Sequence, residues 1–370
     1  MNDFQTAPSS APTVFAYVGS YTDRNHHWHG TGITVFRVEP GSEVWTQVQE
    51  LWQDCVDPSF LALDTQERFL YCVHESLGKV SAFSINKQTG HLTWLNTQAT
   101  NGADPASLSL DPTNRFLVVG NYSSGSVALL PIGPDGKLEP LSQLINLEGK
   151  PGPDKVEQAG SHPHHIQFDP AGQYLMIPDK GFDKVFCYKF DVTSQKLIPN
   201  NPASVQLRAG SGPRHIAFHP SPSQPYAYLI SELASTLTVL KYDAARGSLS
   251  PLQVISTLPP TFRGHNTGAE INIAPSGKFV YGSNRGDDSI VGYQIDPHTG
   301  KLSLIEWVST QGKNPRFCTL DFWGRFLYAA NQDGDSIVAF QVDQETGKLT
   351  PTNQVIAVKN PVCIIFASQA

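Results

Sequence analysis

Three histidines lie within one nine-residue stretch, HPHHIQFDP, at residues 162–170. The stretch begins a predicted β-strand, where a buried strand would ordinarily carry aliphatic side chains. An unperturbed histidine has a pKa of about 6.5, so His164 is a candidate general base near neutral pH. Successive strand residues face opposite sides of a sheet, so we expect only one of His164 and His165 to face a site. The alternative for either ring is a structural role, in which it hydrogen-bonds buried backbone groups.

The histidine stretch opens one copy of a unit that recurs along most of the chain. Each copy has a short strand, a turn of Asp, Pro, Gly or Asn, and a second strand rich in aromatic and β-branched residues. A third strand, a hydrophilic turn such as DPHTGKL and a weaker fourth strand complete it. The period is about 46 to 58 residues, within or slightly above the propeller range. The copies begin at Asp57, Asp104, His162, Gly212, Gly268 and Asn314.

The two ends of the chain make one further unit. NPVCIIFASQA at the C-terminus supplies a first strand, and TVFAYVGSY, GITVFRVE and WTQVQEL near the N-terminus supply the other three. The sequence therefore predicts an all-β, seven-bladed β-propeller of four-stranded antiparallel blades, closed by terminal strands that share one blade. We expect this single domain over residues 13–370, after a disordered tail at residues 1–12. No convincing amphipathic helix separates the strands, which disfavours a parallel α/β fold.

In a propeller the first strand of each blade lines the central channel, and the second strand ends at the mouth where the first begins. Two rings of side chains should therefore meet at one mouth. The position after each blade-opening dipeptide gives Ser59, Ala106, His164, Arg214, Glu270, Arg316 and Val362. The ends of the second strands give Tyr21, Glu75, Tyr122, Lys180, Glu232, Arg285 and Gln332. The mixture of His, Arg and Glu in blades four to seven favours a site for an anionic substrate over a merely hydrated mouth.

The three longest loops are expected to reach the same mouth. They are SYTDRNHHWHGTG in blade one, LEGKPGPDKVEQAGSH before blade four and TLPPTFRGHNTGAE before blade six. Long loops in compact domains are usually functional or disordered. The side chains that could cover the mouth, each of which could equally be solvated, are His26, His27, Trp28, His29, Arg263 and His265.

Composition and motifs disfavour several other classes of protein. The formal net charge is −7 with no basic run, so we expect no nucleic-acid or membrane partner. The chain shows neither a secretory signal pattern nor an apolar run of transmembrane length, so a cytoplasmic protein is expected. The five cysteines are scattered and odd in number, which favours reduced core thiols. No GxSxG, HExxH or GxxxxGK motif supports a serine hydrolase, zinc protease or nucleotide site.

No metal or other cofactor is expected. Glu232 and Glu270 are surrounded by arginine and lysine at the predicted mouth, and such a set is a poor cage for a hard divalent cation. A transition-metal site built from His162, His164 and His215 stays open as a less favoured alternative.

Four motifs resemble those of a known family. HPHH at His162, GPRH at Gly212, SELAST at Ser231 and SNRGDDSI at Ser283 are similar to motifs of the bacterial seven-bladed 6-phosphogluconolactonase family. The same superfamily includes fungal 3-carboxymuconate lactonizing enzymes. The resemblance covers essentially the whole folded chain. It implies a cytosolic, cofactor-independent hydrolase that opens a lactone, most simply 6-phosphogluconolactone to 6-phosphogluconate in the pentose phosphate pathway.

The resemblance also implies catalytic residues. The lactonizing enzymes use a histidine, two arginines and a glutamate, and the motifs carry these roles onto positions of this chain. The implied catalytic residues are His164 or His165, Arg214, Glu232 and Arg285. Glu232 also belongs to the second ring, so two separate arguments point to it. The residues then expected to bind the substrate are Tyr122, Lys180, His215, Glu270, Arg316 and Gln332.

These residue types suit hydrolysis of a small anionic lactone by a monomeric protein. His164 would activate water, Glu232 would orient His164 or act as the base, and the arginines would hold a phosphate or carboxylate or stabilise the oxyanion. Two alternatives stay open. A carboxymuconate-type cycloisomerase needs similar groups, and a propeller can also be a non-catalytic binding scaffold.

Overall fold

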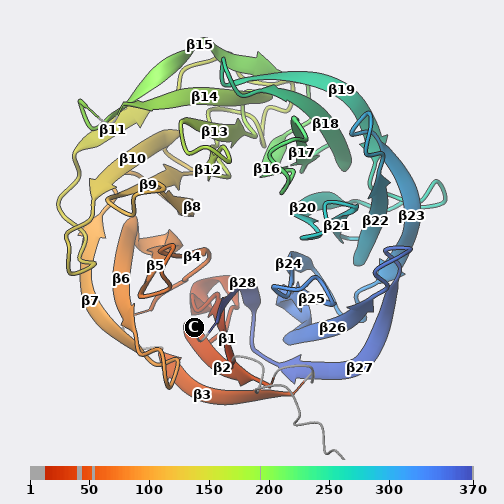
Figure 1. Ribbon diagram of the computed structural model, residues 1–370, viewed down its shortest axis with the longest axis horizontal. Helices are drawn as coiled ribbons and strands as arrows, with labels where there is room; N and C mark the ends of the chain where they lie inside the picture. The colour runs from red at the N-terminus through yellow and green to blue at the C-terminus, as the bar shows by residue number, and fades with distance from the viewer. Residues whose placement is uncertain (1–12, 40–43, 52–54, 192, 369–370) are drawn as a thin grey trace, which may run out of the picture.

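Seven four-stranded antiparallel sheets are arranged in a ring around a central axis, as Figure 1 shows. This computed structural model describes residues 13–368 except 40–43, 52–54 and 192. The predicted seven-bladed propeller is confirmed, and so is its closure, because the C-terminal strand β28 pairs with the N-terminal strand β1 in blade one. The tail expected at residues 1–12 lies outside the described residues.

Each blade contributes one strand to each of four positions, from the channel outward. The innermost strands are β4 (Leu61–Leu63), β8 (Pro105–Leu110), β12 (Gln167–Phe168), β16 (Pro213–Phe218), β20 (Thr267–Ile273), β24 (Pro315–Leu320) and β28 (Pro361–Ser368). The second strands are β5 (Phe69–His74), β9 (Phe116–Asn121), β13 (Tyr174–Asp179), β17 (Tyr226–Ser231), β21 (Phe279–Arg285), β25 (Phe326–Asn331) and β1 (Val14–Ser20).

The outer half of each blade is built in the same way. The third strands are β6 (Lys79–Ile85), β10 (Ser126–Pro131), β14 (Lys184–Asp191), β18 (Thr236–Asp243), β22 (Ser289–Ile295), β26 (Ser336–Val342) and β2 (Ile33–Val38). The outermost strands are β7 (Leu92–Ala99), β11 (Gln143–Asn146), β15 (Lys196–Gln206), β19 (Ser248–Ser256), β23 (Leu302–Ser309), β27 (Leu349–Ala357) and β3 (Trp45–Leu51). The described part of the chain also forms three short 3₁₀ helices: η1 (Arg24–His26), η2 (Glu75–Leu77) and η3 (Gln332–Gly334). Within the described residues, no helix has the length and apolar character needed to cross a membrane.

The hydrophobic core lies between neighbouring blades. The second strands are almost wholly buried, because each of their faces packs against an adjacent blade. Tyrosines of these strands also link the blades, since Tyr281 donates its hydroxyl proton to Gly347 O of the next blade at 2.8 Å. Gly347 has a φ of 72°, and an added Cβ would lie 2.5 Å from the ring of Phe279. The glycine of this TG turn is therefore required both by its backbone conformation and by inter-blade packing. All five cysteines are buried and none forms a disulfide.

A β-bulge lies near the start of most innermost strands. In blade five Pro213 pairs with Ser231 and His215 pairs with Ile230, which leaves Arg214 out of register. In blade seven, Arg316 is out of register with the second strand in the same way. A bulge turns the extra side chain away from the regular alternation of the strand. Shifts at the same place in blades three, six and one involve Ala106, Glu270 and Val362, so the bulges coincide with the first ring predicted from the sequence.

Blade four departs from the predicted strand. Its innermost strand β12 begins at Gln167, not at His162, so this boundary was wrong. Proline has no N–H to donate, and Pro163 and Pro178 both lie in this part of the ladder. What remains is an isolated bridge between Pro163 and Asp179 and a hydrogen bond from His164 N–H to Pro178 O. The histidine segment is therefore irregular backbone, and strict strand alternation does not apply to it.

Candidate active site

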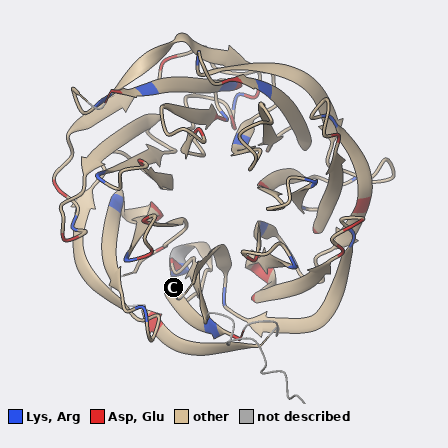
Figure 2. Ribbon diagram, viewed as in Figure 1, with Lys and Arg blue, Asp and Glu red and all other residues tan. Residues whose placement is uncertain are grey.

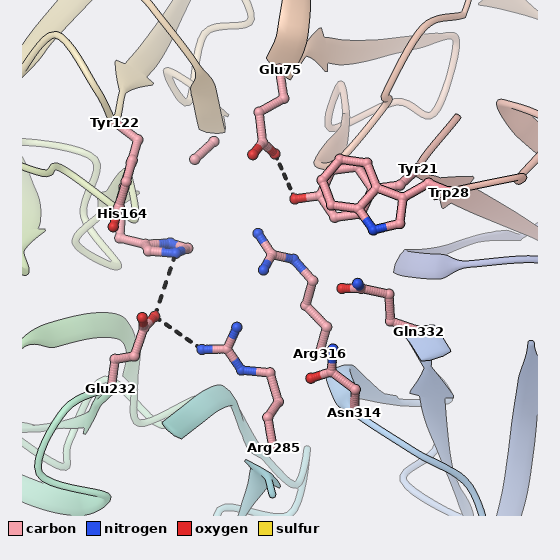
Figure 3. Close-up of a pocket in the computed structure, with 11 residues that line it drawn as sticks. Tyr21, Trp28, Glu75, Tyr122, His164, Glu232, Arg285, Asn314, Arg316 and Gln332 are labelled. Atoms are coloured by element: carbon pink, nitrogen blue, oxygen red, sulfur yellow. Dashed lines mark hydrogen bonds and ion pairs between the residues drawn. The ribbon is translucent and has the colours of Figure 1, made fainter. Parts of the chain in front are cut away.

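A pocket of about 270 Å³ opens at the predicted mouth of the channel (Figure 3). Of the catalytic residues proposed from the sequence, His164, Glu232 and Arg285 line it. Of the proposed substrate-binding residues, the pocket is lined by Tyr122, Arg316 and Gln332. The other lining residues are Tyr21, Trp28, Glu75, Ala106 and Asn314. The start of the innermost strands and the end of the second strands thus meet at one site, as the two rings predicted.

Glu232 is the centre of a buried ion-pair cluster, and it directly follows β17. Its Oε1 accepts a hydrogen bond from Lys180 Nζ at 2.9 Å, and its Oε2 lies 3.1 Å from Arg214 Nε and 3.0 Å from Arg285 Nη2. Burial acts to raise the pKa of the Glu232 carboxyl, but these three positive charges together hold that pKa far below its ordinary value. Glu232 is therefore ionised at physiological pH, and it serves as a counterion and orienting group instead of a proton donor.

Lys180 and Arg214 hold Glu232 from outside the pocket lining. Lys180 Nζ also bonds Tyr122 Oη at 2.9 Å and Glu157 Oε2 at 2.6 Å. Arg214 Nη1 donates to the backbone oxygen of Ala269 at 2.6 Å. Lys180 Nζ and two of the three guanidinium nitrogens of Arg214 are thus engaged within the protein, and neither residue lines the pocket, so the structure places both behind the residues that face it.

Arg316 differs from the other cations of the cluster. Its guanidinium has no hydrogen bond or ion pair with any residue in the described part of the chain. The guanidinium carbon lies 5.2 Å from the centre of the Tyr21 ring, and Tyr21 is held by a 2.7 Å hydrogen bond from its hydroxyl to Glu75 and by stacking on Trp28 at 4.0 Å. Figure 3 shows the Arg316 side chain extending into the middle of the pocket. This cation is therefore available to an anionic ligand.

His164 presents its ring edge to the pocket. Its Nε2 lies 3.8 Å from Glu232 Oε2 and its Nδ1 lies 3.3 Å from His215 Nε2. The side chain is buried, and burial together with the positive charge of Arg214 lowers the pKa of His164 well below its ordinary value. The ring is therefore neutral near pH 7, which leaves one nitrogen free to accept a proton.

The remaining predicted residues lie deeper in the channel. His165 stacks on His215 with ring centres 4.4 Å apart, and its Nδ1 accepts the backbone N–H of Ile216 at 3.2 Å. His165 and Glu270 line a second cavity of about 530 Å³, formed by the later halves of the innermost strands at the other end of the channel. His164, not His165, faces the mouth, and His215 and Glu270 stand behind it.

The long loops contribute less than the sequence suggested. Trp28 lines the pocket, and His26 stacks on it from outside with ring centres 4.9 Å apart. His29 bonds Asp335, and Arg263 bonds the backbone of its own loop. The sequence reasoning missed two residues at the site. Asn314 belongs to the dipeptide that opens blade seven, which was a usable signal, whereas nothing in its loop distinguishes Glu157.

Acidic and basic residues occur together on the inner loops of several blades, as Figure 2 shows. Among the residues that the structure describes, no group of three or more His, Cys, Asp or Glu side chains is arranged to hold a metal ion. His162 turns its Nδ1 toward Tyr122 O at 3.0 Å, so it does not join His164 and His215 in the arrangement that the metal alternative required.

The fold and the site define a β-propeller protein with a small-molecule pocket at one mouth of its channel. Residues 15–366 match the family described as lactonase, 7-bladed beta-propeller, and the chain belongs to this family. The resemblance stated from the four motifs and the lactonase assignment are confirmed.

Relatives agree with the family assignment over most of the chain. A protein of Bacillus subtilis named 6-phosphogluconolactonase is 34% identical over 308 residues, which cover 82% of this chain and 84% of the relative. A 6-phosphogluconolactonase of Formosa agariphila is 34% identical over 315 residues, 82% of this chain and 86% of that protein. The solved structure of a periplasmic gluconolactonase of Pseudomonas aeruginosa has a TM-score of 0.89 at 30% identity, and the match covers 97% of this chain and all of that one.

Proposed function

We propose that the protein hydrolyses 6-phosphogluconolactone to 6-phosphogluconate as a cytoplasmic monomer without a cofactor. Curated relatives carry the corresponding name. The observation that carries the proposal is the unpaired Arg316 guanidinium, which shares one pocket with the neutral ring of His164. The pocket of about 270 Å³ suits a single monosaccharide-sized substrate. The absence of nucleic-acid and membrane partners stays a prediction.

The proposed substrate anchor is Arg316, with Arg285 beside it. A guanidinium binds a phosphate through two parallel N–H···O bonds, and Arg316 has its donors free for this purpose. Arg214, the phosphate ligand suggested by the sequence, has two of its donor nitrogens occupied by Glu232 and Ala269 O. We therefore assign Arg214 to holding Glu232 in place.

His164 acts as the general base in this proposal. Its Nε2 removes a proton from water as the water oxygen forms a bond to the lactone carbonyl carbon. The carbonyl electron pair moves onto oxygen, and Arg285 stabilises that developing negative charge. When the pair returns, the bond from carbon to the ring oxygen breaks and His164 gives its proton to the departing oxygen. The neutral ring and the permanently ionised Glu232 suit this sequence of proton transfers.

The deciding experiment compares hydrolysis of freshly generated 6-phosphogluconolactone and of gluconolactone with EDTA present, corrected for spontaneous hydrolysis. We expect the wild-type protein to prefer the phosphorylated lactone. Arg316→Met should lower kcat/KM on that substrate by about 10²-fold, mainly through KM, and change the unphosphorylated reaction far less. Arg263→Met, in an exposed loop, is the matched control and should leave both reactions unchanged.

Three results would count against parts of the proposal. An equal loss on both lactones in Arg316→Met would refute phosphate binding by Arg316. A wild-type preference for gluconolactone, the substrate class in the name of the Pseudomonas aeruginosa relative, would replace the phosphorylated substrate. Loss of activity in EDTA, restored by added metal, would refute the cofactor-independent reaction.

A further inference from the structure

Behind His164, two more side chains continue a line of close polar atoms away from the pocket. His164 Nδ1 lies 3.3 Å from His215 Nε2. His215 Nδ1 lies 3.1 Å from Glu270 Oε1 and 3.0 Å from Glu270 Oε2. All three side chains are buried, with 7%, 3% and 7% exposure for His164, His215 and Glu270. Neither His215 nor Glu270 lines the mouth pocket, so the line leads away from the substrate site.

The contacts are consistent with one arrangement of protons. Glu270 Oε1 accepts the backbone N–H of Ile271 at 3.0 Å, which marks this carboxylate as an acceptor. His215 then donates from Nδ1, and a neutral His215 has a bare Nε2 that accepts the Nδ1–H of His164. His164 is left with a bare Nε2 toward Glu232 and the pocket. This is the tautomer that a general base requires.

We propose that His215 and Glu270 are positioning residues that keep His164 Nε2 bare and take up the Nδ1 proton of His164 while His164 holds the proton of the attacking water. The inference rests on the proposed lactone hydrolysis. In that reaction His164 holds a proton from the attack of water until the ring oxygen departs, so the buried ring would carry a positive charge unless its Nδ1 proton moves away.

The transfer balances along the line of residues. As water attacks, its proton binds His164 Nε2, the Nδ1 proton of His164 moves to His215 Nε2, and the Nδ1 proton of His215 moves to Glu270 Oε1. The protons move back when His164 Nε2 gives its proton to the departing ring oxygen, so the starting tautomers are restored. Glu270 Oε2 lies 3.0 Å from His215 Nδ1 and accepts no hydrogen bond within the described part of the chain. Glu270 also lines the second cavity of about 530 Å³, away from the substrate.

The electrostatics favour this direction. Burial and the charge of Arg214 make an imidazolium at His164 unfavourable, because both lower its pKa. Burial raises the pKa of Glu270 to about 7, although Arg214 opposes the rise. The titratable or charged groups that face Glu270 are Arg214 and His215 on β16, His165 before β12, Arg316 and Cys318 on β24, and Cys363 on β28.

The first test needs no substrate and no variant of Glu270. In protein labelled with ¹⁵N at histidine, the ring nitrogen shifts give the tautomer of each ring, and the His164 signals are those missing from His164→Gln. We expect protonated Nδ1 and bare Nε2 at His164 near pH 8. The opposite tautomer in the wild-type protein would overturn the inference whether or not the protein hydrolyses the lactone.

The second test is the pH dependence of kcat. In the wild-type protein kcat should rise with pH through about 7 as Glu270 becomes able to accept a proton. Glu270→Gln should lower kcat by about 10- to 100-fold with little change in KM, and this pH limb should disappear. Asn272→Ser, two residues along β20 and lining the same cavity, is the control and should keep the wild-type profile.

The outcomes separate this inference from the proposed function. An inactive wild-type protein with the expected His164 tautomer would refute the lactone reaction alone. An active wild-type protein whose kcat and pH profile survive Glu270→Gln would refute the relay alone. A folded Glu270→Gln protein with lower kcat but an unchanged pH limb would reduce Glu270 to a structural role and overturn the inference.

Discussion

The two ends of the channel are built from the same seven strands, but they carry different kinds of residue. At the mouth the bulged positions differ from blade to blade. At the other end the innermost strands finish on large apolar residues, and the chain then turns. These terminal apolar residues are Leu63, Leu110, Phe168, Phe218, Ile273 and Leu320. We call this second end of the channel the regular end. Its residues are alike in most blades because they pack in the same way in each blade.

The aspartates of the repeat belong to the regular end. Asp111 follows β8, and its Oδ1 accepts the backbone N–H groups of Arg115 and Phe116 at 2.8 and 2.7 Å. Asp169 does the same for Gln173 and Tyr174. These carboxylates close the turn between the first two strands, so their recurrence reflects a structural requirement. Residues that break a repeat, such as Arg316 and His164, mark the site more reliably than residues that keep it.

The larger of the two cavities is not the one that holds the candidate catalytic residues. The cavity at the regular end is about 530 Å³ and the mouth pocket about 270 Å³. The smaller pocket nevertheless holds the unpaired cation, the ion-pair cluster around Glu232 and the neutral histidine. We therefore locate the candidate active site at the mouth and not at the larger cavity.

Substitutions at the two ends of the channel should differ most in their effect on kcat/KM within blade four. His164→Ala should lower kcat/KM on 6-phosphogluconolactone by about 10³-fold, because it removes the proposed general base. Gln167→Ala is the counterpart at the other end, where the Gln167 side chain donates a hydrogen bond to the neighbouring Phe168 O. It should change activity by less than about threefold, a typical result for a residue outside the chemistry. Steady-state kinetics on both variants makes the comparison, and equal losses would contradict it.

Glu232→Gln tests how much the ion-pair cluster at the mouth contributes to stability and activity. The variant leaves Lys180, Arg214 and Arg285 without their shared counterion, so we expect a loss of about 3 to 5 kcal/mol in the free energy of unfolding together with lost activity. The folded pKa of Glu232 lies below its unfolded value. Its contribution is therefore present above the unfolded pKa and disappears as pH falls below about 4.5. Denaturant unfolding from pH 7 to pH 3 should show this slope in the wild-type protein and less of it in the variant.

Asp111→Ala, at the regular end, should lower the stability of the protein without lowering its activity. The change removes the hydrogen bonds that the Asp111 carboxylate accepts from Thr113, Arg115 and Phe116 in the turn after β8, and it should cost at least about 2 kcal/mol in the free energy of unfolding. The folded protein should keep wild-type kcat/KM, because the turn lies at the end of the channel away from the pocket. Thermal unfolding measures the effect on stability and steady-state kinetics measures the effect on activity. A large fall in kcat of the folded variant would show that the regular end also affects activity, and would contradict the prediction.

Much of the fold could be predicted because the signals are local and repeated. Strand alternation and Asp/Pro/Gly turns recur in every complete unit, TG turns recur in blades two, six and seven, and the unmatched terminal strands indicated closure. The histidine segment was the exception. Pro163 and Pro178 removed donors from the ladder, and only the paired strands show that both prolines fall at the same place.

The site could be predicted as a set of positions but not as a set of roles. Sequence reasoning brought His164, Glu232, Arg285 and Arg316 to one mouth, since strand order determines which ends meet. It could not tell that Arg214 is occupied by Glu232 while Arg316 is unpaired, or that His215 stands behind His164.

The sequence by itself thus determined the propeller, its closure and the mouth that carries the site, because these follow from periodicity and connectivity. Only the tertiary structure decided which cation is free, which histidine faces the pocket and which groups lie behind it. Those properties depend on contacts within and between blades, such as Arg214 with Glu232 and His164 with His215, which are 18 and 51 residues apart in the sequence, and on the β-bulges that aim several of the side chains.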